Sequence, residues 1–438
     1  MANGHAAPRS CTIVHLMTVV AGSEASTKAA LAREASRRMG SVTTDQKHEM
    51  LNRVADSLVA SADAIIEANA PEIERGREKG LTEAFIDRMV LTPERIEGIA
   101  ADVRSVAGLP DPVGETIDMT TRPNGLQIGR IRVPLGVIGA IYESRPNVTI
   151  DIAALCLKAG NTVVLRSGSD AHESASVLAA IMQREADAAG LPAGAVQFID
   201  STDREEVGAM LAARDEIDLM VPRGGAELIR RVQLEATMAV VAGGIGVCHT
   251  YIDAGADLQM ACEIVVNAKV KRPSVCNAMD TMLVHADIAE QFLPAAAKAL
   301  AEHGVTVHAD DRAVPLCATG AVVPVDVADY DREWLSLDCS ARVVDSLDDA
   351  LDHIDQHGSG HSEAIVTESY SAAQRFQREA DAAAVFVNAS TYFHDGAQFG
   401  LGAELGVSTQ RMHARGPIGL RELTSYKWIV LGTGHTRD

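Results

Sequence analysis

The chain has 438 residues, too many for a single hydrophobic core, and this length predicts two or three domains. Its composition, 47% hydrophobic and 23% charged residues, is that of a soluble globular protein, and no apolar run is long enough to span a bilayer. The formal net charge of −21 argues against nucleic acid or an anionic membrane surface as a partner.

The cysteines and the first residues bear on the compartment. The seven cysteines are scattered, with no C-x-x-C pair and no zinc-type Cys/His spacing. We therefore expect a reducing cytoplasm, no disulfide framework and no metal. Residues 1–17 make a poor signal peptide, because positive charge is sparse and a histidine interrupts the apolar stretch. We expect them to be a disordered extension, or to result from a start codon upstream of the true one at Met17.

The N-terminal quarter is predicted to be mainly helical. Residues 24–79 follow a helical pattern in which Thr43 and Gln46 fit a capping box. Thr92-Pro93 is typical of an N-cap followed by proline at the first helical position. Residues 105–125 are rich in glycine, proline and threonine, which predicts a surface loop.

Strands and helices alternate from residue 126 onward, which is typical of parallel, doubly wound sheets. The pattern restarts near Tyr251 and predicts a second α/β domain over residues 251–412. The predicted strands are 126–133, 137–142, 161–166, 197–200, 219–221, 281–285, 341–344, 364–367 and 423–430. The predicted helices are 170–189, 204–213, 226–235, 257–270, 289–304 and one from Asp348.

Two strand-to-helix turns have a composition suited to nucleotide binding. They are Arg166-Ser167-Gly168-Ser169 and Pro222-Arg223-Gly224-Gly225. Ligands of open α/β sheets bind at the carboxyl ends of the strands, where glycine permits close backbone approach and arginine pairs with phosphate. The chain contains neither G-x-G-x-x-G nor a Walker pattern. Short turns that use glycine only for geometry therefore remain the alternative interpretation.

Cys276 is the cysteine whose surroundings favour reactivity. A thiolate is the nucleophilic form, and nearby positive charge or a helix N-terminus lowers the pKa of a cysteine. Lys269, Lys271 and Arg272 supply charge, and Pro273-Ser274 predicts a helix start just before the thiol. The same cations would attract a substrate that carries a carboxylate or a phosphate. The alternative is a buried cysteine beside a solvated basic patch.

Other nucleophile patterns are incomplete. The run 360–364 (GHSEA) lacks the last glycine of a G-x-S-x-G elbow. Cys248-His249 follows a glycine pair, and we expect it to pack in the core rather than to line a site.

Five segments together resemble a known family. Residues 267–278, which contain Cys276, are similar to the catalytic signature of the γ-glutamyl phosphate reductases, the glutamate-5-semialdehyde dehydrogenases of proline biosynthesis. This family belongs to the aldehyde dehydrogenase superfamily. The resemblance covers nearly all of the chain from about residue 20. The other matching segments are 132–150, 159–172, 386–421 and 425–429.

The resemblance implies an α/β, aldehyde-dehydrogenase-like fold, with two doubly wound domains and a β oligomerisation arm. It places an NADPH-binding domain at 18–125 and 143–250, a catalytic domain at 251–412, and the arm at 126–142 and 413–438. It also implies a cytoplasmic homo-oligomer, either dimer or tetramer, with a functional link to glutamate 5-kinase.

The resemblance also implies roles for individual residues. Cys276 would be the nucleophile, and Asn147 would form an oxyanion hole with the backbone N–H at the cysteine. Glu333 would contact the nicotinamide ribose, and the turns at 166–169 and 222–225 would contact NADPH.

The implied reaction is the NADPH-dependent reduction of L-glutamate 5-phosphate to L-glutamate 5-semialdehyde. The thiolate attacks the acyl phosphate, phosphate leaves, and hydride from NADPH reduces the resulting thioester. Charge alone makes Arg145, Lys271 and Arg272 the candidates for binding the substrate.

Two alternatives remain. A hydrolytic aldehyde dehydrogenase would use a glutamate base just upstream of a glycine pair, but the corresponding run 239–249 contains no carboxylate. A non-catalytic scaffold is the second alternative, and the presence of both Cys276 and Asn147 argues against it.

Overall fold

The computed structural model describes residues 22–241, 243, 245–317 and 320–437. The predicted extension at residues 1–17 lies outside this part of the chain. The fold divides into two compact units. Unit 1 comprises Met1–Val241 with Leu423–Asp438, and unit 2 comprises Ala242–Glu422. No helix in the described residues is long and apolar enough to cross a membrane.

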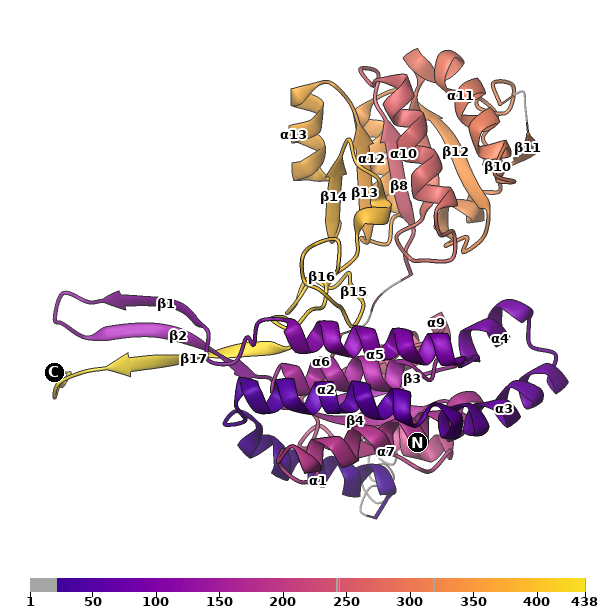
Figure 1. The fold of residues 1–438 in the computed structure, drawn as a ribbon. Helices are drawn as coiled ribbons and strands as arrows, with labels where there is room; N and C mark the ends of the chain where they lie inside the picture. Colours follow the sequence, from indigo (N-terminus) through magenta and orange to yellow (C-terminus); the bar gives the residue numbers. More distant parts are fainter. Residues whose placement is uncertain (1–21, 242, 244, 318–319, 438) are drawn as a thin grey trace, which may run out of the picture. The chain divides into compact units, whose positions relative to one another are not determined.

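Unit 1 begins with a helical layer (Figure 1). The predicted helical stretch 24–79 is divided into separate helices. Thr43 and Gln46 form the predicted capping box, and Thr92 caps the helix that Pro93 begins, so both start signals are confirmed. The helices of this layer are α1 (Glu24–Met39), α2 (Thr44–Ala60), α3 (Ala62–Glu78), α4 (Glu83–Met89) and α5 (Pro93–Gly108).

The described part of unit 1 contains a five-stranded parallel sheet in the order β5-β4-β3-β6-β7. Its strands are β3 (Val137–Tyr142), β4 (Thr162–Ser167), β5 (Val196–Phe198), β6 (Leu219–Arg223) and β7 (Ala239–Val240). The connecting helices are α6 (Val148–Lys158), η1 (Ser169–Ala171), α7 (His172–Ala188), α8 (Arg204–Ala212) and α9 (Ala226–Glu235). The chain runs outward from β3 in one direction and returns to its other side with β6. The strand order therefore reverses between β3 and β6, where such sheets bind ligands.

An antiparallel sheet formed by β1 (Thr116–Thr121), β2 (Gln127–Pro134) and β17 (Thr424–Leu431) extends from unit 1. Figure 1 shows β17, from the end of the chain, beside β2. The prediction of a surface loop over 105–125 was wrong in part, because α5 reaches Gly108 and β1 pairs with β2. β1 alternates apolar and polar residues only over Ile117 to Met119, and almost all of it is exposed, so the strand signal is short.

The predicted limits of the arm also need correction. The segment 126–142 is split, because only β2 lies in the antiparallel sheet, while β3 pairs with β4 and β6 in the parallel sheet. All six residues of β3 are buried, as in a central parallel strand. Residues 413–422 belong to unit 2, so the C-terminal contribution to this sheet begins at Thr424.

In the described residues of unit 2, seven parallel strands form one sheet in the order β11-β10-β12-β9-β8-β13-β14. They are β8 (Cys248–Ile252), β9 (Met279–His285), β10 (Thr306–Ala309), β11 (Ala321–Pro324), β12 (Asp338–Val344), β13 (Ser362–Val366) and β14 (Ala384–Val387). The helices are α10 (Leu258–Val270), α11 (Ala286–Ala301), η2 (Val327–Asp331), α12 (Leu347–His357), α13 (Tyr370–Glu379) and η3 (Thr391–Phe393). A short antiparallel pair, β15 (Val407–Ser408) and β16 (Gly416–Pro417), follows.

Candidate active site

Cys276 lies in a turn between α10 and β9 of unit 2 and is half-buried. The predicted helix start at Pro273-Ser274 is wrong. The N–H of Val275 donates to the Arg272 carbonyl at 3.3 Å, and the N–H of Ala278 donates to the Val275 carbonyl at 3.1 Å. β9 begins three residues after the thiol and is buried from its first residue, which leaves no room for a helix.

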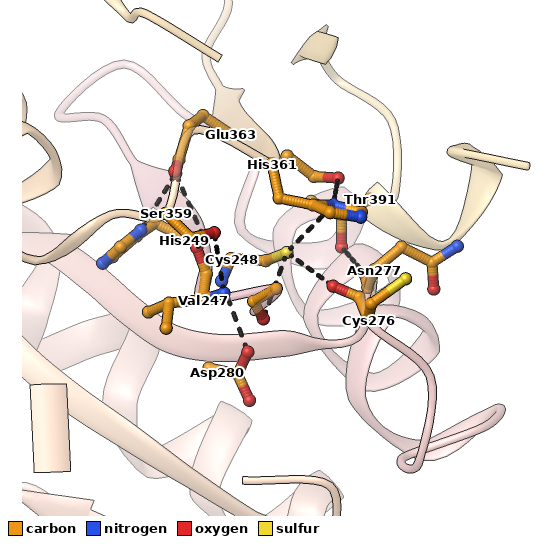
Figure 2. Close-up of polar contacts among 12 residues, drawn as sticks. Val247, Cys248, His249, Cys276, Asn277, Asp280, Ser359, His361, Glu363 and Thr391 are labelled. Carbon is orange, nitrogen blue, oxygen red and sulfur yellow. Dashed lines mark hydrogen bonds and ion pairs between the residues drawn. The ribbon is translucent and has the colours of Figure 1, made fainter. Parts of the chain in front are cut away.

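The turn lies at the amino-terminal edge of the sheet. The parallel strands β8, β9 and β13 begin at Cys248, Met279 and Ser362, and the residues just before and at these starts gather around the thiol turn (Figure 2). Open α/β sheets usually bind ligands at the carboxyl ends of their strands. In unit 2 the candidate nucleophile instead lies at the opposite edge of the sheet, at the amino ends of the strands.

A second thiol fixes the backbone of Cys276. The Sγ of Cys248 lies 3.1 Å from the Cys276 carbonyl oxygen, and burial raises the Cys248 pKa, so it remains a protonated donor. A Cβ at position 246 would overlap the same carbonyl, so only glycine fits there. Cys248 is buried, as the sequence predicted, but sequence reasoning missed its contact with the thiol turn. The preceding glycines were the available signal.

The residue after the thiol is anchored as well. The Nδ2 of Asn277 donates to the carbonyls of His394 at 3.1 Å and Tyr392 at 3.3 Å, and the Thr391 hydroxyl donates to the Asn277 carbonyl at 2.7 Å. The backbone on both sides of the Cys276 side chain is thus held in one conformation, which preorganises the thiol.

The three predicted cations have different surroundings. Lys271 and Arg272 are exposed, whereas Lys269 is buried with its Nζ 3.7 Å from the Asp280 carboxylate. Asp280 also accepts from the backbone N–H groups of Cys248 and Trp334, yet burial raises its pKa to about 7. Lys269 is therefore buried and paired with Asp280. The positive charge that faces solvent near Cys276 comes from Lys271 and Arg272.

Two buried histidines belong to a chain of polar contacts that begins at Cys248. The Nδ1 of His361 lies 3.7 Å from the Cys248 Sγ (Figure 2). The same nitrogen lies 2.7 Å from the Ser362 hydroxyl, which in turn lies 2.8 Å from the Nδ1 of His394. Burial lowers the pKa of His361 to about 3 and of His394 to about 4, so both rings are neutral near pH 7. In sequence, the run Gly360-His361-Ser362 resembles only an incomplete serine elbow, which gives no signal for the contacts of the two histidines.

Glu333 lies in unit 2 and accepts a hydrogen bond from the backbone N–H of Gly246 at 3.2 Å. Burial raises its pKa, while this bond and the charge of Lys269 oppose the shift. The residue expected to contact a nicotinamide ribose is therefore joined to the same glycine that packs on the Cys276 carbonyl.

The two predicted nucleotide turns lie at the carboxyl ends of β4 and β6 in unit 1, on either side of β3. In the first turn, Arg166 donates through Nη2 to the carbonyls of Thr202 and Asp203, both at 3.2 Å. Burial lowers the pKa of Arg166, and its Nε is buried without a hydrogen-bond partner. Ser167 is buried near His172, and the N–H of Gly168 donates to the Tyr142 carbonyl at 2.7 Å.

The second turn contacts Glu143, which sequence reasoning missed. The N–H of Gly225 donates to the Glu143 carboxylate at 3.1 Å, and a Cβ at Gly224 would overlap that carboxylate. Glu143 follows β3 directly and also donates its N–H to the Arg223 carbonyl at 3.0 Å. A protein carboxylate therefore occupies the amino end of α9.

Asn147 and Arg145 lie in the segment between β3 and α6 of unit 1. The Nδ2 of Asn147 donates to the Asp151 carboxylate at 2.8 Å, and burial raises the Asp151 pKa to about 7. Arg145 is exposed. The structure thus brings Cys276, Lys271, Arg272 and Glu333 together within unit 2, and Asn147, Arg145 and the two turns within unit 1. No cluster of metal-ligating side chains is found among the described residues.

The sequence profile of the aldehyde dehydrogenase family matches residues 8–324. The γ-glutamyl phosphate reductase of Dehalococcoides mccartyi is 53% identical over 413 residues, covering 94% of this chain and 97% of that protein. The chain belongs to the aldehyde dehydrogenase family, in its γ-glutamyl phosphate reductase branch. The enzyme of the same name from Moorella thermoacetica is also 53% identical, over 419 residues, covering 95% and 99% of the two chains.

Solved structures of the family confirm the predicted fold. The crystal structure of γ-glutamyl phosphate reductase from Thermotoga maritima superposes with a TM-score of 0.92 at 45% identity, covering 95% of this chain and all of that one. An acetylating aldehyde dehydrogenase from Geobacillus thermoglucosidasius shares the fold, with a TM-score of 0.66 at 17% identity and coverage of 95% and 98%. Enzymes of the aldehyde dehydrogenase family use a nicotinamide cofactor.

Proposed function

We propose that this protein reduces L-glutamate 5-phosphate to L-glutamate 5-semialdehyde with NADPH and releases phosphate, through a thioester on Cys276. This is the second step of proline biosynthesis from glutamate, and the proposed location is the cytoplasm. The names of the relatives support the substrate. The proposed source of the acyl phosphate is glutamate 5-kinase, as a functional link.

One observation carries the proposal. The segment that would hold a water-activating carboxylate in a hydrolytic enzyme instead places Gly246 and Cys248 against the Cys276 carbonyl. Because residues 239–249 contain no carboxylate, they supply no carboxylate base that would activate water against a thioester. A fixed thiol without such a base suits reduction of the acyl group rather than its hydrolysis.

In the proposed mechanism the Cys276 thiolate attacks the acyl carbon of the substrate. The exposed cations Lys271 and Arg272 attract the anionic substrate to the thiol. Asn147 supplies an amide N–H to the developing oxyanion, and Asp151 orients that amide through its hydrogen bond. Arg145 is the remaining candidate for substrate binding. The neutral rings of His361 and His394 keep additional charge away from the thiol turn.

The residues of unit 1 fit a phosphorylated nicotinamide cofactor, which supplies hydride when bound. Arg166 offers a buried, unpartnered Nε at the carboxyl end of β4, and Arg223 lies at the corresponding end of β6. We assign Arg166, Ser167, Gly168 and Ser169 to the 2′-phosphate side, and Pro222 to Gly225 to the other turn. Glu333 is the proposed contact to the nicotinamide ribose.

We also propose that the protein is a homo-oligomer assembled through the antiparallel sheet of unit 1. β17 lies at the edge of that sheet, and Tyr426, Trp428 and Val430 on it are 48%, 60% and 55% exposed. An edge strand with exposed large apolar side chains is a template for pairing with another chain.

The test is the reverse reaction, NADP⁺ reduction by L-glutamate 5-semialdehyde, with and without inorganic phosphate. The proposal requires turnover that depends on phosphate and disappears in Cys276→Ala. Phosphate-independent turnover would mean that water resolves the thioester, as in a hydrolytic aldehyde dehydrogenase. Wild-type protein without turnover, and with a Cys276 alkylated no faster than a model thiol, would indicate a scaffold.

A further inference from the structure

A polar cavity of about 280 Å³ lies within unit 2, and its lining includes Gly358, Ser359 and Gly360, directly before His361. It is bounded by the carboxyl-terminal ends of α12 and α13, by the loop 358–360, and by the segment that follows β15. Its volume is close to the ~300 Å³ lower limit of small-molecule pockets. Cys276 does not line it, and neither do the candidate substrate residues Arg145, Lys271 and Arg272.

Two orphaned polar atoms belong to residues that line this cavity. The Oε1 of Glu363 is buried and has no hydrogen-bond partner, although Oε2 accepts from the backbone N–H and the Nδ1 of His249. The Nε of Arg415 is also buried and has no partner. An unsatisfied buried donor or acceptor costs about 1–3 kcal/mol, and a bound ligand that pairs with it recovers that cost.

The rest of the lining carries charge of both signs. Arg415 donates to the Asp381 carboxylate at 2.6 Å and to its carbonyl at 3.1 Å, and Arg411 pairs with the other oxygen of the same carboxylate. Asp381 thus holds both guanidinium groups at one side of the cavity. The remaining lining carboxylates are Asp355, Glu363 and Glu379.

We propose that this cavity binds the α-amino and α-carboxylate groups of an amino acid. Two lining residues, one with an orphaned acceptor and one with an orphaned donor, match a ligand that presents a cationic N–H donor and an anionic acceptor on groups attached to one carbon. The ammonium binds Glu363, and the carboxylate binds Arg415. A dicarboxylate would leave Glu363 facing a like charge, and a plain amine would leave Arg415 unpaired.

The cavity is connected to the thiol turn through one short loop. The Ser359 hydroxyl accepts from the backbone N–H of Val247 at 2.9 Å, one residue before Cys248. Gly360 adjoins Arg415, because a Cβ there would lie 3.5 Å from its Nη2, and the next residue is His361. The ligand is therefore either the amino-acid end of the substrate or a free amino acid that acts through this loop.

The test uses L-glutamate as a stable probe and measures its binding to the full chain by isothermal titration calorimetry. We expect saturable binding by L-glutamate, and at least tenfold weaker binding by glutarate, which lacks the amine, and by 4-aminobutyrate, which lacks the α-carboxylate. Arg415→Gln and Glu363→Gln should each weaken L-glutamate binding at least tenfold. Arg312→Gln is the matched control, because Arg312 pairs with Asp345 at 2.6 Å outside the cavity.

Steady-state kinetics show whether the ligand of the cavity is the amino-acid end of the substrate or a free amino acid. If the substrate occupies the cavity, Arg415→Gln raises the KM for L-glutamate 5-semialdehyde at least tenfold with little change in kcat, and L-glutamate competes with the semialdehyde. If a free amino acid is the ligand, KM is unchanged, and L-glutamate alters the rate without competing. Arg415→Lys, which keeps the charge, and a melting curve for each variant separate ligand loss from misfolding.

L-glutamate that fails to bind at millimolar concentration, or glutarate that binds equally well, would overturn the proposal. So would unchanged binding in a folded Arg415→Gln variant. The inference rests on the proposed function only for the choice of L-glutamate. If the wild-type enzyme shows no phosphate-dependent turnover but binds L-glutamate through Arg415, the proposed reaction fails and the amino-acid site stands.

Discussion

The thiol of Cys248 donates to the carbonyl of Cys276 at 3.1 Å, so one cysteine fixes the backbone that carries the other. We predict that Cys248→Ala lowers kcat about tenfold and changes the KM values little, because a loosened turn misplaces the Cys276 Sγ. The lost hydrogen bond contributes about 0.5–1.5 kcal/mol to stability. Steady-state kinetics and melting curves check this. Cys339→Ala, at another fully buried position in unit 2, removes the same atom. An equal loss of activity in both variants would contradict the role of Cys248.

Gly246→Ala should reduce kcat at least a hundredfold. Its Cβ would overlap the Cys276 carbonyl oxygen, so the turn must shift, and a misplacement of about 1 Å at a reacting group costs about a hundredfold in rate. Gly98→Ala is the matched control, because a Cβ there meets no atom within 4 Å. That variant lies within a helix and should keep full activity, with slightly higher stability. Normal turnover by Gly246→Ala would show that the turn tolerates displacement.

Acid should destabilise unit 2 through its histidines. The folded state depresses the pKa of His394 from 6.5 to about 4, so the unfolded state binds more protons between these values. Stability from this group is complete above pH 6.5 and falls as the pH drops toward 4, by about 2 kcal/mol at pH 5. Urea unfolding of the wild type and of His394→Gln at pH 5 and 7.5 measures the difference. An equal pH dependence in both proteins would contradict the shift.

Arg166→Gln should weaken the binding of NADPH more than the binding of NADH. A charge-assisted contact to phosphate contributes about 1.5–3 kcal/mol, which corresponds to about a 10- to 100-fold loss in kcat/KM for NADPH. NADH lacks the 2′-phosphate and should lose much less. The comparison variant is Arg230→Gln, which removes an exposed arginine on α9. If kcat/KM falls by the same factor with NADPH and with NADH, Arg166 stabilises the turn and does not recognise the 2′-phosphate.

Trp428→Ala should shift the protein toward smaller assemblies, because Trp428 is 60% exposed on an edge strand. Sedimentation velocity over a range of concentrations measures this. Tyr370, which is 76% exposed on α13, supplies the matched aromatic control as Tyr370→Ala. If the two variants sediment alike and match the wild type, the antiparallel sheet is not the assembly surface.

Sequence motifs a few residues long predicted the helix starts correctly. The capping box at Thr43 and the Thr92-Pro93 start could be read directly, because each depends on residues within one turn of helix. The alternation of strands and helices also predicted two α/β domains with parallel sheets, whereas the aldehyde dehydrogenase fold was implied by the family resemblance. β1 and the Cys276 turn could not be predicted in this way. β1 is defined by pairing with β2, and the turn is forced by the buried strand that follows it.

The candidate site was predicted only in part, for the same reason. Cys276 and the two turns carry compositional signals. The contacts of Glu143 in unit 1, and those of Cys248 and His361 in unit 2, form only because strands distant in sequence begin or end at the same edge of their own sheet. Cys248 and His361 are 113 residues apart, and Glu143 and Gly225 are 82 residues apart. No spacing rule links residues at such separations. The orphaned atoms of Glu363 and Arg415 likewise emerge only from packing.

The pairing of β17 with β2 joins the last strand of the chain to one of its first, and Asn161 reinforces it by donating to the Leu423 carbonyl at 2.9 Å. During synthesis the ribosome must add all of unit 2 before β17 emerges. At ~5–20 residues per second, the roughly 290 residues between β2 and β17 take about 15–60 s. Throughout that time one edge of β2 lacks its partner on every nascent chain. On a polysome, neighbouring chains present the same edge to one another, so the order of synthesis exposes this protein to premature association.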